Sequence, residues 1–287
     1  MDIWQRKPIS TIDHDPRPTT AFALDDIHDG AYRDMISHDY HFTTATATHP
    51  GHMRSINEDS IFADPARGIW LVADGMGGHR DGGIASAMIV KAVGSIPVDD
   101  NALSGLLASV DVVNEDLLRR SNGVHDQIIG STVIALVVED RRYTCLWAGD
   151  SRCYLIRGGT VKQLSEDHTE VQELLNSGAI TEQEAAIWPR RNVITRAIGV
   201  DLALKLDATS GQLENDDRFV LCSDGLTGHV SDVEILAISK ESSPEVFCAE
   251  LLKLALERGG KDNISIIVVQ ASKSNRTIVL EHGNHQA

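Results

Sequence analysis

Short apolar runs of strand length alternate along this chain with longer stretches in which apolar residues recur at helical spacing. The apolar runs predict strands at residues 41–48, 60–63, 68–73, 131–138, 143–148, 153–156, 161–164, 204–208, 219–222 and 264–269. Helical spacing predicts helices at 82–96 and 103–118, and cap signals predict others after Thr169, Thr181, Ser231 and Ser243. Because tight turns join several strands as hairpins, the pattern predicts an antiparallel sheet core with helices outside, an α+β layout.

The apolar run from Ile69 to Ala73 ends abruptly in a carboxylate, Asp74, which is followed by three glycines in four positions and then by His79. A buried strand that stops at Asp-Gly places the carboxylate at its end, where it can face a cleft. The glycines allow positive φ and bring backbone carbonyls close to the same place. Carboxylate and carbonyl oxygens suit a hard divalent cation, although a tight turn after a core strand explains this stretch equally well when it is taken alone.

The two ends of the chain and one internal segment differ from this pattern. Residues 1–42 carry prolines, histidines and scattered acids without a period, so we interpret them as an arm, disordered or loosely packed, with one short helix near 29–36. We predict one main domain at 43–270, an excursion from its core at 166–199 and a C-terminal tail at 271–287. Four histidines fall close together around the junction of arm and domain, and their spacing matches no ligand pair, so we interpret them as solvated: His38, His41, His49 and His52.

Composition and charge narrow the classes of function. The formal net charge is −16, which argues against a nucleic-acid backbone or an anionic membrane surface as partner and suits carboxylates gathered around metal ions. The four cysteines form no CxxC pair, so we expect free thiols in a reducing compartment. The first ten residues do not form a signal peptide, and no apolar run is long enough to span a bilayer. We therefore expect a cytoplasmic protein.

Acidic residues recur at the edges of predicted strands. Asp74, Asp150, Asp224 and Asp262 each lie at such an edge. In a sheet core these edges can converge on one rim, where crowded carboxylates repel one another unless cations lie among them. Oxygen ligands without cysteine or histidine in the same places favour Mg²⁺ or Mn²⁺ over Zn²⁺. A turn explains each acid separately but explains the whole set poorly.

Six short motifs contain these acids and their neighbours: residues 54–59 (RSINED), 74–79 (DGMGGH), 130–132 (GST), 149–152 (GDSR), 223–226 (SDGL) and 262–265 (DNIS). In this order they resemble the motifs of the type 2C family of metal-dependent serine/threonine protein phosphatases, and the form DGMGGH resembles the bacterial branch. The resemblance extends from about residue 41 to residue 270. It implies two packed antiparallel β-sheets flanked by helices, an αββα sandwich, with a two-metal centre at one end.

The resemblance also implies a ligand set for two Mn²⁺ or Mg²⁺ ions. Asp74 matches the aspartate that bridges both ions, and Gly75 matches the glycine whose carbonyl binds the first. Asp224 and Asp262 match ligands of the second ion, and Glu58 matches a residue that acts on it largely through water.

Further roles follow from the same resemblance. Asp150, together with Asp224, matches the ligands of a third metal that bacterial members often hold. Asp59 would orient metal-bound water, and Arg54 matches the arginine that grips the substrate phosphate, a task suited to a planar cationic fork. The implied reaction is direct attack by a metal-bridging hydroxide, without a phosphorylated enzyme.

Two departures from the family pattern leave points open. Animal members have a histidine directly after Asp-Gly, where this chain has Met76; His79, three positions later, is a candidate general acid, with metal-bound water or a structural His79 as alternatives. The excursion at 166–199 matches the family's variable flap. Four of its residues could meet substrate, although we expect at least two to be solvated: His168, Arg190, Arg191 and Arg196.

The resemblance implies partners as well. We expect phosphorylated proteins as substrates, an opposing bacterial serine/threonine kinase, and a monomer that binds neither nucleic acid nor membrane. A catalytically silent phosphoprotein-binding module on the same fold is the alternative, against which the retained Asp74, Asp224 and Asp262 argue. A metal-dependent phosphodiesterase or nuclease is a third possibility, which the charge of −16 disfavours.

Overall fold

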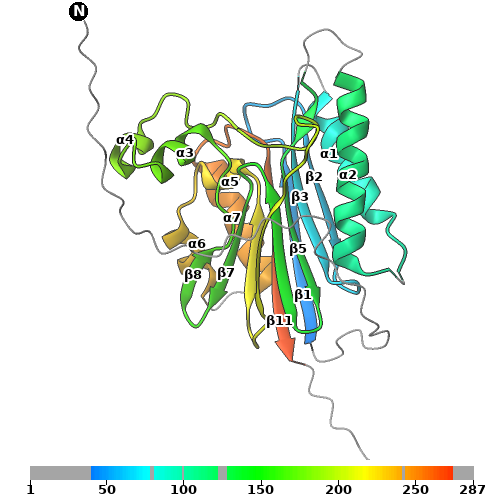
Figure 1. The fold of residues 1–287 in the computed structure, drawn as a ribbon. Helices are drawn as coiled ribbons and strands as arrows, with labels where there is room; N and C mark the ends of the chain where they lie inside the picture. Colours follow the sequence, from blue (N-terminus) through cyan, green and yellow to red (C-terminus); the bar gives the residue numbers. More distant parts are fainter. Residues whose placement is uncertain (1–39, 78–80, 99, 122–127, 241–242, 274–287) are drawn as a thin grey trace, which may run out of the picture.

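Two antiparallel β-sheets pack face to face in the computed structural model, which describes residues 40–77, 81–98, 100–121, 128–240 and 243–273 (Figure 1). One sheet has the order β1 (Tyr40–His49), β11 (Ile264–Lys273), β10 (Arg218–Cys222), β7 (Arg152–Arg157) and β8 (Thr160–Gln163). The other has the order β2 (Asp59–Asp64), β3 (Ile69–Met76), β5 (Val133–Glu139), β6 (Arg142–Ala148) and β9 (Asp207–Gln212), with β4 (Gly130–Ser131) beside β3. The predicted α+β class with antiparallel sheets is confirmed.

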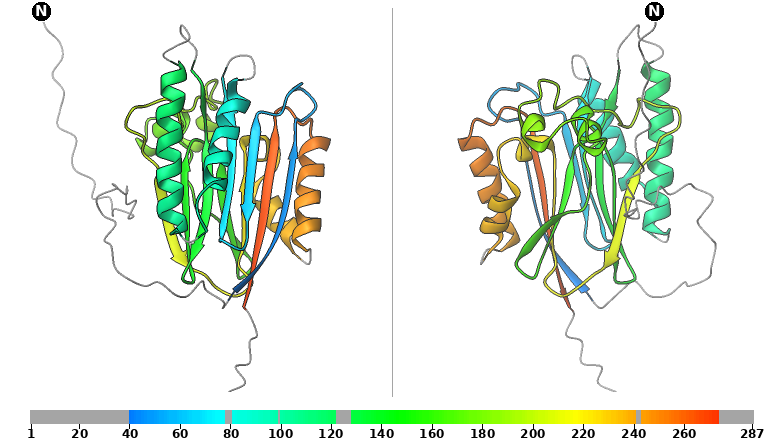
Figure 2. Two further views of the ribbon diagram at one scale, coloured as in Figure 1. Left: turned by 90° about the vertical axis from the view of Figure 1, so that its right-hand side faces the viewer. Right: turned by 60° about the vertical axis from the view of Figure 1, so that its left-hand side comes forward.

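Helices cover the outer face of each sheet, so the molecule has four layers (Figure 2). The pair α1 (Asp81–Gly94) and α2 (Ala102–Ser121) packs on the sheet of β3. The set α5 (Asp224–Thr227), α6 (Asp232–Ser239) and α7 (Pro244–Glu257) packs on the sheet of β11. The last helix begins at the predicted cap, where the Ser243 side chain accepts a hydrogen bond from the Val246 N–H at 3.4 Å.

The central strand β3 explains why its sequence is apolar without alternation. Ile69 and Leu71 point to the helical layer, whereas Trp70 and Val72 point to the core between the sheets. All four are fully buried. A strand with both faces covered has no position at which a polar side chain would meet water, and its apolar stretch ends where β3 reaches the rim at Asp74.

The predicted excursion at 166–199 contains two short helices, α3 (Glu170–Asn176) and α4 (Glu182–Ala186). Thr181 and Glu184 form the predicted capping box, with both reciprocal hydrogen bonds present. The predicted box at α3 is half right, because Thr169 caps the helix but the Gln172 side chain donates to Asn176 instead. We refer to residues 166–199 as the flap.

Two strand predictions need correction. The strand predicted at 204–208 is β9, which begins at Asp207 opposite Trp147; Leu204 and Leu206 before it pack against the helical layer instead of pairing. The strand predicted at 131–138 is interrupted at Thr132.

Pairing of β1 with β11 runs from residue 40 to residue 273, three residues beyond each predicted domain limit. The helix predicted at 29–36 lies outside the described residues.

Within the described residues, no helix combines the length and apolar character needed to cross a bilayer.

Candidate metal centre

The predicted ligands come together at the rim of the sandwich where several strands begin or end. Asp59 starts β2 and pairs directly with Asp74 near the end of β3. Asp150 lies in the turn between β6 and β7, and Asp224 starts α5 directly after β10. Asp262 lies just before β11, the neighbour of β10. In an antiparallel sheet, every second connection between strands lies at the same end. Residues far apart in sequence therefore meet at one rim.

The carboxylates perturb one another, which shows that they share one neighbourhood. Burial raises the pKa of Asp74 well above its ordinary value, and the negative charges of Asp59, Asp224, Asp150 and Asp262 raise it further. Four other acids thus influence the buried Asp74 carboxyl. Such a group favours either protons or bound cations.

The other buried acids show the same effect. Burial, followed by the charge of Asp224, raises the pKa of Asp150 to about 7. Burial also raises the pKa of Asp59 to about 6, although its carboxylate accepts a hydrogen bond from Ser223 Oγ at 2.8 Å. The pKa of Asp224 is raised to about 6 by burial and by the charges of Asp262 and Asp59. These carboxyls are poised between charged and neutral forms near neutral pH.

Unpartnered oxygen atoms fit a metal centre. Glu58 Oε1, Asp59 Oδ1 and Asp150 Oδ1 are buried and have no hydrogen-bond partner within the described part of the chain. Buried oxygens of this kind are costly unless a cation or water binds them. No three His, Cys, Asp or Glu side chains among the described residues are gathered tightly enough to hold a metal ion as they stand. The acids therefore share one rim of the sandwich without forming a compact ligand cluster among the described residues.

Arg54 lies at the exposed side of this group. Its Nη2 is 2.7 Å from Asp262 Oδ2, and the two side chains are 54% and 38% exposed. The hydrogen bond with Asp262, and the nearby charges of Asp262, Asp224 and Glu58, raise the pKa of Arg54. The guanidinium that the family resemblance assigns to substrate phosphate therefore contacts a predicted metal ligand.

Close backbone packing explains two of the glycines. A Cβ on Gly75 would lie 2.1 Å from the Gly82 carbonyl oxygen at the start of α1. A Cβ on Gly225 would lie 1.9 Å from the carbonyl oxygen of Asn263. Glycine is required at both positions because any side chain would separate the segments that carry Asp74, Asp224 and Asp262.

Asn263 is a positioning residue to which the sequence analysis assigned no role. Its Oδ1 accepts the Glu58 N–H at 2.8 Å, and its Nδ2 donates to the carbonyls of Pro50 and Ile56 at 3.0 and 2.9 Å. One side chain thus fixes the segment that carries Arg54 and Glu58. Its place beside Asp262 in the DNIS motif was a signal that it belongs to the site, but its partners lie more than 200 residues away.

Hydroxyl groups make a second set of supports that the sequence analysis missed. Thr132 Oγ1 accepts the Asp74 N–H at 3.1 Å and lies 2.8 Å from Ser151 Oγ. Ser131 Oγ donates to the Asp74 carbonyl at 3.0 Å. The interruption between β4 and β5 at Thr132 therefore ties Asp74 to the turn that holds Asp150. The GST motif marked these residues without indicating what they contact.

The flap residues named as possible substrate contacts separate into two groups. Arg190 and Arg191 are exposed, and Arg190 pairs with Glu170 at 2.8 Å. His168 is buried, however, and Arg196 is bonded to Asp207 at 2.7 Å. His79 lies outside the described residues, so its predicted role stays a prediction.

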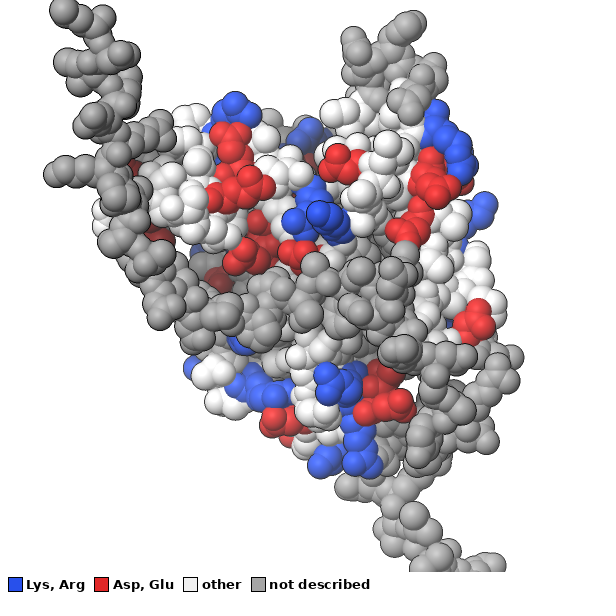
Figure 3. All heavy atoms as spheres, viewed as in Figure 1, with Lys and Arg blue, Asp and Glu red and all other residues white. Residues whose placement is uncertain are grey.

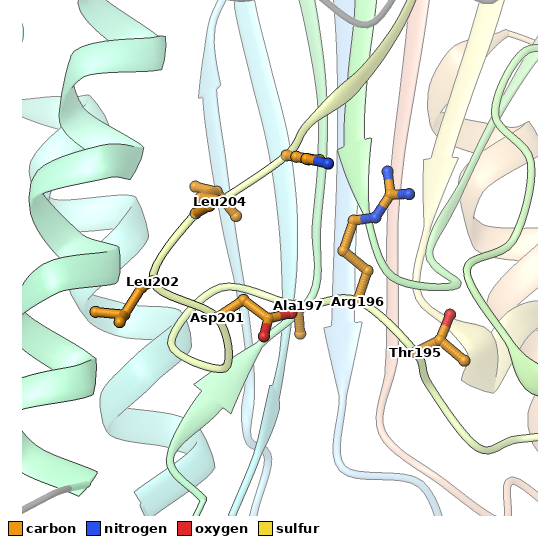
Figure 4. Close-up of a pocket in the computed structure, with 8 residues that line it drawn as sticks. Thr195, Arg196, Ala197, Asp201, Leu202 and Leu204 are labelled. Atoms are coloured by element: carbon orange, nitrogen blue, oxygen red, sulfur yellow. The ribbon is translucent and has the colours of Figure 1, made fainter.

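A pocket of about 450 Å³ lies where the flap returns to the core, lined by Thr195, Arg196, Ala197, Asp201, Leu202, Ala203, Leu204 and Lys205 (Figure 4). Leu202 and Leu204 lie on the side of α2, and Arg196 extends on the opposite side. None of the predicted ligands lines it, so it is a neighbouring hollow and not the metal centre itself. On the face seen in Figure 3, basic side chains alternate with acidic ones and form no unbroken basic surface among the described residues.

A four-layer sandwich with buried carboxylates at one rim defines the class of metal-dependent phosphatases of type 2C. The model of the family "Protein phosphatase 2C" matches residues 51–264. The chain therefore belongs to the protein phosphatase 2C family, and its enzyme class is protein serine/threonine phosphatase.

Individual relatives support the same family assignment. The serine/threonine phosphatase stp of Listeria welshimeri is 34% identical over 236 residues, covering 78% of this chain and 93% of that protein. The solved structure of PppA, a key regulatory component of T6SS in Pseudomonas aeruginosa, has a TM-score of 0.73 and 37% identity, covering 80% of this chain and 98% of PppA. A structure of the PstP catalytic domain in complex with two manganese ions has a TM-score of 0.73 and 32% identity, covering 81% of this chain and 99% of that chain.

Proposed function

We propose that this chain hydrolyses phosphoserine and phosphothreonine in proteins, with divalent cations bound at the rim by Asp74, the Gly75 carbonyl, Asp224 and Asp262. The observation that carries the proposal is the group of buried carboxylates with unpartnered oxygens on a protein phosphatase 2C fold. The donors are oxygens, which suits Mn²⁺ or Mg²⁺. When bound, two such ions would supply charge neutralisation for the phosphoryl group and lower the pKa of water near it.

The chain's own residues would orient the reactants. Glu58 and Asp59 each have a buried oxygen free to accept a hydrogen bond from water. Arg54, exposed at the open side, would bind the phosphate through its planar fork once it leaves Asp262. Asp150, buried and unpartnered at Oδ1, would hold a third ion together with Asp224.

A phosphothreonine peptide is the direct test of this function. We expect chelator-treated protein to be inactive and Mn²⁺ to restore hydrolysis. Asp224→Asn should lower kcat/KM by about 100-fold or more, because a charged group at the reacting centre is lost. Asp232→Asn, at an exposed position at the start of α6, is the matched control and should retain activity. Full activity in chelator, or a phosphate trapped on a side chain, would contradict the proposal.

Substrate class separates this proposal from a phosphodiesterase. We expect p-nitrophenyl phosphate to be turned over far faster than bis-p-nitrophenyl phosphate, because Arg54 and the cations suit a phosphomonoester dianion. Preference for the diester would overturn our assignment. A silent binding module would turn over neither compound while still binding phosphoprotein.

The partners belong to the same proposal. We infer that the enzyme opposes a bacterial serine/threonine kinase in the cytoplasm, because the relatives it resembles are bacterial serine/threonine phosphatases. We also propose that it acts as a monomer. A phosphoproteome comparison between the wild type and Asp224→Asn would name the substrates. Removal of residues 1–39 would test the arm: an effect on phosphoprotein alone, with p-nitrophenyl phosphate unaffected, would assign it to docking.

A further inference from the structure

His168 lies between the turn that carries Asp150 and the carboxylate of Asp207. Its Nδ1 accepts the Gly149 N–H at 3.1 Å, and its Nε2 lies 3.1 Å from Asp207 Oδ2. The residue is only 8% exposed. A buried side chain with a partner on each ring nitrogen is fixed in position.

These partners define the tautomer of the ring. Because Nδ1 accepts a hydrogen bond from a backbone N–H, it carries no proton. The proton of the neutral ring is then on Nε2, where it is donated to the Asp207 carboxylate. Asp207 is well suited to this role, since its hydrogen bonds with His168 and Arg196 lower its pKa and keep it charged.

The turn that His168 holds is tightly constrained on its other side as well. Gly149 has a φ of +116°, and a Cβ there would lie 2.5 Å from Thr132 Cβ. Ser151 Oγ, at the far end of the turn, lies 2.8 Å from Thr132 Oγ1. Asp150 is therefore flanked by a contact to His168 on one side and a contact to Thr132 on the other.

The same histidine ties this turn to both ends of the flap. The His168 N–H donates to the Gly149 carbonyl at 2.9 Å, and the Thr195 N–H donates to the His168 carbonyl at 2.9 Å. Arg196 Nη1, on the returning end, is 2.7 Å from Asp207 Oδ1. The Trp147 ring stacks on the imidazole with 6.1 Å between centroids.

We propose that His168 is a positioning residue that aims the Asp150 carboxylate through Nδ1 and anchors the base of the flap through Nε2. The proposal rests on the proposed function in one respect, the assignment of Asp150 as a ligand of the third ion. The two ring nitrogens have different roles. The Nδ1 contact sets the affinity for a cation at Asp150, and the Nε2 contact sets the stability of the flap.

Two substitutions, each keeping a polar atom near one ring nitrogen, test the nitrogens separately. His168→Asn keeps an acceptor at the Nδ1 position and loses the contact with Asp207, whereas His168→Gln keeps a donor at the Nε2 position and leaves the Gly149 N–H without its acceptor. The test is a calorimetric titration of chelator-stripped full-length protein with Mn²⁺. We expect His168→Gln to lower the affinity for the Mn²⁺ ion whose binding requires Asp150 by about tenfold, because the residue that positions this ligand is lost. His168→Asn should stay within about twofold of the wild type.

The flap should show the reverse order. Hydrogen exchange at residues 169–195 should accelerate in His168→Asn and remain close to the wild-type rate in His168→Gln. If both variants change Mn²⁺ affinity and flap hydrogen exchange to the same extent, or change neither, the proposal is overturned. If Asp150→Asn leaves the Mn²⁺ titration unchanged, Asp150 is not a ligand and the proposal fails, while the two-metal phosphatase function stands.

The wild-type protein provides a measurement that does not depend on how the variants fold. Nitrogen-15 spectra of the neutral imidazole, recorded on Mg²⁺-bound protein, should show the His168 proton on Nε2. A proton on Nδ1 would contradict the proposal, because that nitrogen could not then accept from Gly149.

Discussion

Arg54 has two alternative partners at the open side of the carboxylate cluster. In the structure it pairs with Asp262 at 2.7 Å, yet its exposure and planar fork suit a substrate phosphate. Because one guanidinium fork cannot contact both fully, a cation at Asp262 would release Arg54 for phosphate. We therefore expect Arg54 to link cation binding to substrate binding.

Arg54→Ala should therefore have two opposite effects. We expect kcat/KM on a phosphothreonine peptide to fall by about 100-fold, because a donor to the phosphoryl group is lost. The affinity for Mn²⁺ should increase by up to about fivefold, since a half-exposed ion pair contributes at most about 1 kcal/mol. Lys261→Ala removes a charge next to Asp262 without removing this ion pair, and it should change both quantities less. Equal effects of the two substitutions would show that only overall charge matters.

The acids that meet at the rim could be predicted from sequence because each lies in a local pattern. Asp74 and Asp224 each precede a glycine at a strand end, so the acidic side chain and the residue that permits the turn are adjacent in sequence. The supports could not be predicted in this way. Asn263 and His168 contact partners that only the fold brings near, so their sequence neighbours carry no sign of the contact.

At the scale of elements, the start of α1 packs directly on the end of β3. A Cβ on Gly82 would lie 2.7 Å from both the carbonyl carbon and oxygen of Gly75, whereas a Cβ on Gly83 would lie 3.7 Å from its nearest neighbour, Glu58 Cα. The first distance is a clash and the second is ordinary contact. The position of the Gly75 carbonyl thus depends on a helix that contains no predicted ligand.

These adjacent glycines make a matched pair. We expect Gly82→Ala to displace the Gly75 carbonyl, to weaken Mn²⁺ binding by about tenfold and to lower activity in proportion. Gly83→Ala should leave both unchanged and should not destabilise the protein, because alanine favours helix over glycine. The measurements are Mn²⁺ calorimetry and thermal unfolding of both variants. Equal Mn²⁺ affinities would mean that the helix does not set the carbonyl position.

Elements with strong periodicity were predicted well, and weakly specified ones were not. The strand β3 and the helices α1, α2 and α7 have long apolar patterns or clear caps, and the structure has them close to the predicted residues. The strand β9 was misplaced because Leu204 and Leu206 are apolar for packing on the helical layer, a pattern that strand pairing produces equally well.

At the scale of the whole molecule, buried acids at the rim are an electrostatic cost to the metal-free fold. The ordinary pKa of these aspartates is 3.8, but burial raises it to about 6 for Asp59 and Asp224 and to about 7 for Asp150. Between pH 4 and pH 7 these three carboxyls therefore bind more protons in the folded state than in the unfolded chain. Their contribution to the free energy of unfolding decreases as pH rises through that range.

Chelator-treated protein should accordingly be more stable at pH 5 than at pH 7.5. With saturating Mn²⁺ the trend should reverse, because cations bind the ionised carboxylates and their affinity increases with pH. Urea unfolding at both pH values, with EDTA or Mn²⁺, measures the effect, and Asp150→Asn should reduce the slope in EDTA. A chelated protein that gains stability from pH 5 to 7.5 would show that the rim acids are not the dominant group.

The central claim is that acids from separate strands form one divalent-cation centre that hydrolyses phosphoserine and phosphothreonine. The most direct measurement is a Mn²⁺ titration of chelator-stripped protein in which bound metal and phosphothreonine-peptide hydrolysis are recorded together. The account predicts at least two bound Mn²⁺ per chain, hydrolysis that rises with their occupancy, and loss of both in Asp74→Asn. Hydrolysis at an unchanged rate in protein without bound metal, or an Asp74→Asn variant with normal binding and turnover, would contradict it.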